Sequence, residues 1–343
     1  MAGYLSNNLR FLVGKLETTA GTMETLTADD FNVQVRNPEL TLNVEVDDEN
    51  SKWARGDHGE DHSIQGVQTA TTNFAVRCVT GLPVTTEPMW SKFLKACGQK
   101  EVLYAETGYG WQPLKEYDNK TMTIWVYDVQ QGATPSAVVY KLKGCMGNVT
   151  IGADGVGKPW LAAFAFQGVV DSVVDVTTAD ILVPAHMDTN CADKMLSNVA
   201  YVGTVPEKIS SFSLDAGNEL NPVYDQSSSA GIAYYTITAR HPRLSMNPLA
   251  QLVATRDVWS ELTSGVTGCP TTQAIGIGDT GISTKFWIQV PKAQTLSSAL
   301  ANREGLVSWD QNFKLLANGE TGALTDDDFS TETTFEVLQG TRS

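Results

Sequence analysis

The sequence predicts a mainly β protein of the α+β class, made of two tandem β-sandwich units that each carry one flanking helix. Three observations lead to this prediction. Long stretches alternate apolar and polar residues, which is the period of a half-buried strand. Only 18% of the residues are charged, and 29 glycines supply turns. The order strand, strand, helix, strand hairpin occurs twice, which predicts a first unit over 1–175, a linker or arm over 176–208 and a second unit over 209–343.

The first predicted unit is organised around a hairpin at 137–170. Its other expected elements, in chain order, are an N-terminal arm over 1–30, strands over 31–35, 40–46 and 72–78, a helix over 88–98 and a strand over 122–126. Asn37-Pro38 indicates a turn between the first two strands. Pro88 suits the first turn of the helix and Gly98 the position just after its end. The glycines of Gly152–Gly157 predict the turn of the hairpin.

The second predicted unit repeats this order. Its expected elements are a strand over 212–217, a strand over 230–240, a helix over 247–259, a strand over 286–290, a crossover, a strand over 307–315 and a final strand over 333–338. Asn247 is the expected N-cap of the helix and Pro248 its first residue. Leu252 and Trp259 are expected on its apolar face. Repetition of a whole unit is typical of chains that assemble into pseudo-symmetric rings.

Charge and cysteine usage exclude several classes of partner. The net charge is −15, which argues against tight nucleic-acid binding because phosphate contacts need clustered Lys and Arg. The five cysteines form no CxxC pair, which predicts reduced thiols and assembly in a reducing compartment. The N-terminus lacks the apolar region of a signal peptide, and no stretch reaches the about 20 apolar residues of a membrane helix. We therefore expect no membrane partner.

No motif in the sequence predicts an enzyme, a cofactor or a metal site. His58 and His62 flank two carboxylates, but Gly56 and Gly59 break the helix that would put both rings on one face, and no third ligand is identifiable. The GxGxxG match at Gly276–Gly281 is followed by a strand pattern instead of the required helix, so a turn is favoured. No Ser lies in a GxSxG elbow. Acidic runs such as 326–328 are interpreted as solvated surface.

Five segments of the chain resemble the tail tube protein, or major tail protein, of long-tailed bacteriophages. They are KLETTAGT at Lys15–Thr22, PMWSKFLKACG at Pro88–Gly98, YKLKGCMGNVTIGADGVGKPWLAAFAFQG at Tyr140–Gly168, SFSLDAGNEL at Ser211–Leu220 and GIAYYTITARHPRLSMNPLA at Gly231–Ala250. The resemblance covers most of the chain, and its motifs are patterns of small and apolar residues. It implies tail-tube-like β-sandwich units and a structural virion protein that self-assembles into stacked rings, the conduit for DNA delivery into the host.

The resemblance also implies a ring geometry and a set of partners. Members of the family commonly form hexameric rings in which each subunit gives four strands to an inner barrel, so a chain with two units would form a trimer with pseudo-sixfold symmetry. Twenty-four strands give a barrel of roughly 45–50 Å, narrowed by side chains to roughly 35 Å. The expected partners are other copies of the chain, a tape measure protein, and tail terminator and tip proteins, while DNA passes without specific binding. The expected location is the virion tail, assembled in the host cytoplasm.

Two groups of residues are expected to serve this assembly. The long acidic loop 47–66 would contact the next ring, through Asp47, Asp48, Glu49, Lys52, Trp53, Arg55, Asp57, His58, Glu60, Asp61 and His62. The lumen would be lined by Asn43, Glu45, Asn73, Thr236, Thr238, Asp310 and Asn312. Lys141, Lys143 and Lys314 lie on similar strands and argue against a uniformly negative lumen. The alternatives are the tube of a contractile injection particle, or a metal- or sugar-binding β-sandwich enzyme that uses His58 and His62.

Overall fold

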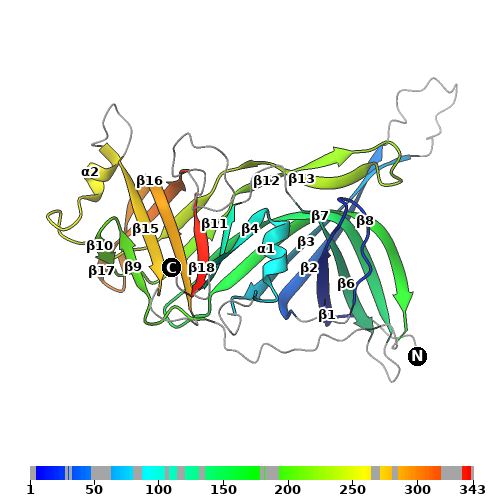
Figure 1. Cartoon of the computed structure of the whole chain (residues 1–343), viewed down its shortest axis with the longest axis horizontal. Helices are drawn as coiled ribbons and strands as arrows, with labels where there is room; N and C mark the ends of the chain where they lie inside the picture. Colours follow the sequence, from blue (N-terminus) through cyan, green and yellow to red (C-terminus); the bar gives the residue numbers. More distant parts are fainter. Residues whose placement is uncertain are drawn as a thin grey trace, which may run out of the picture.

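The computed structural model is a mainly β protein, as the sequence predicts (Figure 1). It describes residues 5–27, 30, 33–47, 63–79, 87–104, 108–113, 120–130, 136–177, 181, 193–263, 271–279, 285–317 and 334–340. Within these residues, one antiparallel sheet contains 16 strands, and a separate sheet contains two. The division into two tandem sandwich units stays a prediction. The two halves of the chain nevertheless order their strands in the same way.

The first half of the chain supplies a set of six neighbouring strands. They are β1 (Leu5–Leu16), β2 (Val35–Asp47), β3 (Ile64–Arg77), β6 (Met122–Gln130), β7 (Ala137–Ala153) and β8 (Leu161–Val176). Their order in the sheet is β1-β6-β7-β8-β3-β2. The predicted hairpin at 137–170 is therefore present as β7 and β8, and both strands are longer than expected.

The second half supplies a set of six strands in the same order. They are β9 (Val199–Val202), β11 (Phe212–Asp215), β14 (Arg243–Met246), β15 (Thr272–Gly278), β16 (Phe286–Arg303) and β17 (Leu306–Leu315). Their order in the sheet is β9-β15-β16-β17-β14-β11. If the six strands of each set are numbered 1 to 6 along the chain, their order across the sheet is 1-4-5-6-3-2 in both sets. The two sets are joined where β11 pairs with the end of β7.

Six further strands are added around this shared order. They are β4 (Gln99–Tyr104), β5 (Gly108–Pro113), β10 (Val205–Glu207), β12 (Asn218–Tyr224), β13 (Ile232–Arg240) and β18 (Glu336–Gly340). β18 pairs with both β16 and β5, so it links the two halves a second time. β12 and β13 form the two-stranded sheet, which we call the arm. The arm extends from the second half of the chain across β7 and β8 (Figure 1).

Two short helices lie at corresponding places, each after the third strand of its set. The first, α1 (Ser91–Ala96), buries Phe93 and Leu94. Gly98 follows its C-cap residue Cys97, as predicted, and has the positive φ of 68° that glycine adopts most easily. The second, α2 (Val258–Thr263), buries only Val258. Neither helix is long and apolar enough to cross a membrane.

Aromatic rings form a core that runs through both halves of the chain. In the first half, Phe93 of α1 packs against Phe164 and Phe166 of β8, with ring centroids 5.5 and 6.2 Å away. At the junction, Trp160 lies 4.7 Å from Phe212 of β11 and 6.3 Å from Phe286 of β16. The two sets of strands are therefore held by buried apolar contacts as well as by the β7–β11 pairing, since such ring pairs add to the hydrophobic burial.

Several expected loops and turns are strands in the structure. The expected N-terminal arm contains the 12-residue strand β1, paired with β6. The predicted turn at Asn37-Pro38 is a bulge within β2, where Asn37 has a φ of 50° and the register shifts. An edge strand tolerates a proline there because its outer N–H needs no partner in the sheet. The expected linker over 176–208 contains β9 and β10, which extend the sheet beside β15.

The predicted helix over 247–259 is wrong. Asn247 accepts hydrogen bonds from the backbone N–H groups of Ser210 and Ser211, both at 2.9 Å, so it ties two loops together instead of capping a helix. The stretch 251–257 is irregular, and helix α2 begins only at Val258. Leu252 and Trp259, expected on a buried face, are exposed. The expected crossover after 290 is absent as well, because β16 continues to Arg303.

Lys92 of α1 is a half-buried lysine whose charge opposes folding at neutral pH. Its Nζ donates to the backbone oxygen of Asp30 at 2.7 Å. Burial lowers its pKa to about 8, although the charge of Asp30 acts in the opposite direction. An unfolded lysine has a pKa of about 10.4, so the folded state binds fewer protons between these values. The free energy of unfolding should therefore gain a contribution that rises between pH 8 and about 10.5, by at most about 1.4 kcal/mol per pH unit.

The variant Lys92→Met should lack this contribution. We expect the difference in unfolding free energy between wild type and variant, from urea titrations at several pH values, to change across this window in favour of the wild type. The exposed Lys314→Met is the control for the loss of one lysine side chain. A Lys92→Met curve parallel to that of the wild type would show that Lys92 keeps its ordinary pKa in the folded chain.

Candidate assembly surface

Eight consecutive strands of the large sheet form one uninterrupted run. In order they are β2, β3, β8, β7, β11, β14, β17 and β16, so each half of the chain contributes four. One face of the run carries buried apolar residues, including Phe74, Phe164, Ile151, Leu214 and Phe313. The other face carries the alternate residues, because successive side chains of a strand point to opposite sides.

We call this second side the small-residue face. Its members follow the register across the strands: Glu39, Thr41, Asn43, Thr71, Asn73, Arg77, Ala163, Ala165, Gln167, Asn148, Thr150, Ser213, Asp215, Arg243, Ser245, Asp310, Asn312, Lys314, Ser297 and Ala299. Most of these side chains are short and uncharged. The register places Asp215 next to Arg243, and Arg243 next to Lys314.

Basic and acidic side chains are mixed on the small-residue face. Binding to phosphates requires clusters of Lys and Arg, since the affinity comes from neutralised charges and released counterions. The basic members Arg77, Arg243 and Lys314 are interspersed with the acidic members Glu39, Asp215 and Asp310. Most of the other members are threonine, serine, asparagine or alanine. The face therefore has few long side chains that could bind a ligand.

The structure places four of the seven proposed lumen residues on this face. Asn43, Asn73, Asp310 and Asn312 are exposed there. Glu45 is exposed too, at an irregular step in the β2–β3 register.

The other two proposed lumen residues, Thr236 and Thr238, lie on β13, outside the eight-strand run. The side-chain amide of Asn221 donates to the Thr238 hydroxyl at 2.5 Å within the arm. The period-two pattern of β13 resembles that of the other strands, so the sequence alone did not separate it from them.

Lys141 and Lys143 have partners on neighbouring strands. The Nζ of Lys141 lies 4.4 Å from the ring centre of Trp125 on β6. The Nζ of Lys143 lies 3.0 Å from a carboxylate oxygen of Asp171 on β8. Both lysines are on the part of β7 that pairs with β6, away from the part that pairs with β11. Lys314, in contrast, lies on β17 beside β14.

The expected inter-ring loop lies almost wholly outside the described residues. This applies to Asp48, Glu49, Lys52, Trp53, Arg55, Asp57, His58, Glu60, Asp61 and His62. Asp47 ends β2, and Ile64 begins β3. The loop is thus shorter than expected, because Ile64–Gly66 is part of a strand. It connects the far ends of β2 and β3, which extend beyond the body of the sheet (Figure 1).

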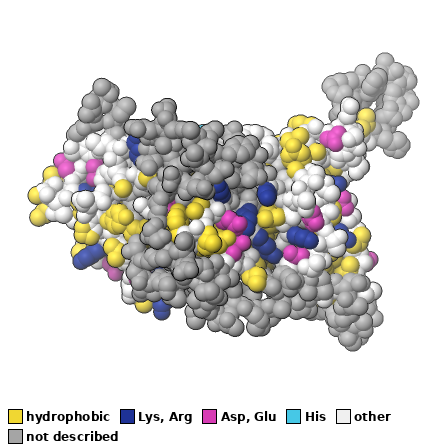
Figure 2. Space-filling model, in the orientation of Figure 1, with side chains coloured by type: hydrophobic (Ala, Val, Ile, Leu, Met, Phe, Trp, Pro, Cys, Tyr) yellow, Lys and Arg dark blue, Asp and Glu magenta, His cyan; other side chains and the backbone are white. Residues whose placement is uncertain are grey.

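Both ends of the eight-strand run have an edge without a strand partner in the described part of the chain. β2 pairs only with β3, and the C-terminal half of β16 pairs only with β17. Exposed apolar side chains accompany these edges: Leu42, Val44 and Val46 on β2, and Leu300 on β16. Figure 2 shows hydrophobic side chains on the surface over the far ends of β2 and β3. Exposed apolar strand edges invite pairing with another chain.

Leu42 and Leu300 are the residues that sequence reasoning missed. Leu42 belongs to the alternation that predicts a half-buried strand, so it was assigned to the inside. Leu300 falls in the stretch expected to be a crossover. Their exposure follows from the position of their strands at the ends of the run, and a local pattern does not contain that information.

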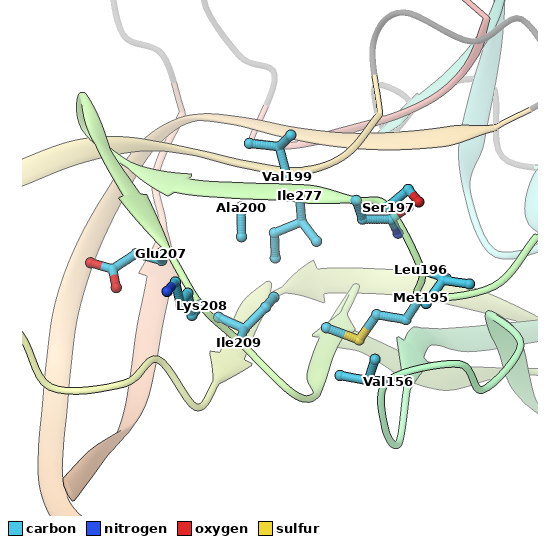
Figure 3. A pocket seen from close by; sticks show the side chains of 11 residues that line it. Val156, Met195, Leu196, Ser197, Val199, Ala200, Glu207, Lys208, Ile209 and Ile277 are labelled. Atoms are coloured by element: carbon cyan, nitrogen blue, oxygen red, sulfur yellow. The ribbon is translucent and has the colours of Figure 1, made fainter. Parts of the chain in front are cut away.

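The pocket between the β7–β8 turn and β9–β10 is small and mainly apolar. Figure 3 shows Val156, Met195, Ile209 and Ile277 around it, with Glu207 at one side. Its volume of about 240 Å³ is below the roughly 300–1,000 Å³ of typical ligand sites. Within the residues that the structure describes, no group of three or more His, Cys, Asp or Glu is placed to hold a metal ion. Cys78, Cys97 and Cys145 are free and buried, and burial raises the pKa of each thiol.

Neither a scan against protein-family models nor a search of curated proteins found a match to this chain.

Proposed function

We propose that this protein is a structural virion component that self-assembles into stacked rings and forms the tail tube of a long-tailed bacteriophage, the conduit through which DNA is delivered. The observation that carries the proposal is the eight-strand run, with its small-residue face and, among the described residues, an edge without a strand partner at each end. Such a run closes into a barrel when copies join edge to edge, and closure removes the exposed edges. The sequence resemblance to tail tube proteins supports the same assignment.

The repeated strand order supports a ring of three chains. Each half of the chain contributes four strands to the run, and β11 of the second half joins β7 of the first. Three copies would give 24 strands with pseudo-sixfold symmetry, hence a barrel of roughly 45–50 Å before side chains are counted. With the small-residue face inward, the channel would be lined by short polar side chains of mixed charge, which suits passage of DNA without retention.

The proposal assigns further contacts to other parts of the chain. The loop over 48–62, between β2 and β3, would contact the next ring in the stack. A tape measure protein would occupy the channel during assembly, and terminator and tip proteins would cover the ends of the tube. The protein would act without catalysis or cofactor, in the virion tail, after assembly in the host cytoplasm.

Electron microscopy of the purified protein tests the proposal. We expect hollow rings or tubes of uniform width at high protein concentration in negative stain, because both unpartnered edges are present in every copy. The matched control is the same preparation at low concentration, where the equilibrium should shift toward single chains. A chain that stays monomeric at all concentrations, or that forms only irregular aggregates, would contradict the proposed function.

A further inference from the structure

We infer that the outer edge of β2 pairs antiparallel with the C-terminal half of β16 in a second copy of this chain, with Leu42 opposite Asn302 and Asn43 opposite Ala301. The inference deepens the proposed function, on which it rests, by naming the two surfaces that meet and their register. It comes from the junction between the two halves of one chain, where β11 pairs with β7. The contact between copies would repeat this junction.

The two hairpins that anchor the comparison correspond residue by residue. The last pair before the turn is Gly152 with Leu161 in β7–β8 and Arg303 with Leu306 in β16–β17. Both hairpins carry one extra residue on their first strand. The regular register resumes at Met146 in β7 and at Ser297 in β16, each six residues before the last pair. A bulge at the same place in both hairpins fixes the alignment, since bulges set register.

The correspondence extends across the sheet to the two edge strands. In the first half, Gly168 pairs with Ala70, and Ala70 pairs with Leu42. In the second half, Phe313 pairs with Leu244, and Leu244 pairs with Leu214. Phe313 is as far from the start of β17 as Gly168 is from the start of β8. Leu42 of β2 therefore corresponds to Leu214 of β11.

The junction within the chain then predicts the register between copies. Leu214 pairs with Ile151, and Asp215 pairs with Thr150. Ile151 corresponds to Asn302 and Thr150 to Ala301, counted from the hairpin turns. Transferring both pairs places Leu42 opposite Asn302 and Asn43 opposite Ala301.

Residues at the internal junction are buried, whereas the corresponding residues at the outer edges are exposed, as expected if a second copy normally covers those edges. Leu214 is 1% exposed, whereas the corresponding Leu42 is 40% exposed. On the receiving strands, Val149 of β7 is 2% exposed and the corresponding Leu300 of β16 is 67% exposed. In each pair, the residue at the internal junction is covered and its counterpart at the chain's outer edge is not. Pairing of β2 with β16 would bring these exposed apolar side chains out of water.

The arm shows how the rest of β2 and β3 would lie. At the internal junction, the continuation of β11 is the arm, which packs Ile232 and Ile237 against Met146 and Val169 of the β7–β8 hairpin. The corresponding continuation of β2 and β3 carries exposed apolar residues, Val44, Val46 and Ile64. These would pack on the β16–β17 hairpin of the second copy, where Leu296 is exposed.

Engineered disulfides test the register directly. The backbone N–H of Ala216 donates to the oxygen of Val149 at 3.0 Å, so the next pair, Asp215 with Thr150, is of the non-hydrogen-bonded kind that brings side chains closest. The corresponding pair between copies is Asn43 and Ala301. The variant Asn43→Cys/Ala301→Cys, in a background with Cys191→Ser and Cys269→Ser, should form covalent dimers and trimers under oxidation. Since a ring closes at three, no larger covalent species should appear.

Two matched variants make the result decisive. Asp215→Cys/Thr150→Cys should form the same bond within one chain, which shows that the chemistry works at this geometry. Asn43→Cys/Ser297→Cys places the second thiol four residues away on the same face and should cross-link at least tenfold less. Rings without the Asn43–Ala301 cross-link would overturn the inferred pairing and leave the tube function standing. Absence of both rings and cross-link would overturn the two proposals together.

Discussion

Replacing Leu42 with aspartate is expected to prevent ring assembly while leaving the single chain folded. The side chain is 40% exposed in one copy, so a carboxylate there remains hydrated in the monomer. In the ring it would be covered by β16 of the next copy, opposite Asn302 and near Leu300, and an unpaired charge removed from water costs several kcal/mol. Because a closed ring contains three such contacts, this free-energy cost applies three times per ring. Size-exclusion chromatography should show loss of rings, and thermal unfolding should show a melting temperature close to that of the wild-type monomer.

The neighbouring position provides the matched control. Thr41 is on the same strand, one residue away, but its side chain belongs to the small-residue face, which stays in contact with water. Thr41→Asp should therefore still assemble. Leu214→Asp, at the internal counterpart of Leu42, should instead unfold the chain, because Leu214 is 1% exposed. Assembly of Leu42→Asp at the wild-type concentration would show that this edge does not form the contact.

Replacing Arg256 with methionine is expected to lower the free energy of unfolding by about 3–5 kcal/mol. The guanidinium is buried between two carboxylates: Nη1 donates to Glu207 at 2.8 Å, and Nε and Nη2 donate to Glu261 at 2.8 and 2.9 Å. Burial acts to lower the pKa of Arg256, but the hydrogen bonds and charges of Glu261 and Glu207 outweigh it and raise that pKa. Without the arginine, Glu207 would remain buried as an uncompensated charge.

Urea unfolding of the monomer measures this loss. Arg77→Met is the control, because Arg77 is exposed and such changes usually stay within about 0.5 kcal/mol. The double variant Arg256→Met/Glu207→Gln should recover part of the stability, since the buried carboxylate at Glu207 is then neutral. If the single variant lost less than about 1 kcal/mol of unfolding free energy, the ion pairs of Arg256 with Glu207 and Glu261 would not be what holds α2 against β10.

The parts of the fold that the sequence predicted are those with a clear local period. Strand β8 alternates buried Phe164 and Phe166 with exposed Ala163 and Ala165, so its pattern identifies it without tertiary information. Helix α1 is followed by the predicted stop signal, Gly98, but it begins at Ser91, three residues after the Pro88 expected in its first turn. In each of these cases, local chemistry and tertiary burial favour the same conformation.

The missed elements are those whose structure depends on distant partners. Strands β9 and β10 span only four and three residues, too few for a pattern to identify them, and β9 pairs with β15 while β10 pairs with β9. The helical spacing of Leu252, Val253 and Trp259 predicted a helix, but these side chains are exposed. The segment is instead fixed by Arg256, which pairs with Glu207 and Glu261. Propensity is a weak prior where tertiary contacts decide.

The candidate assembly surface was only half predictable for a related reason. Alternation showed that β2 has two faces and placed Asn43 on the polar one. It did not show that β2 lies at the end of an eight-strand run, because pairing between strands far apart in sequence is invisible to a local pattern. The correspondence of Leu42 with Leu214 needed the full register of both halves.

The number of chains in one ring tests the account most directly, because the two halves of the chain are proposed to take equivalent places in it. Native mass spectrometry of rings, prepared under conditions that prevent stacking, should give a species with three times the chain mass of 37.1 kDa. Electron microscopy of the same rings should show six similar sectors that alternate in detail. A ring of six chains would contradict the equivalence of the two halves, and a single-chain mass at every concentration would contradict assembly itself.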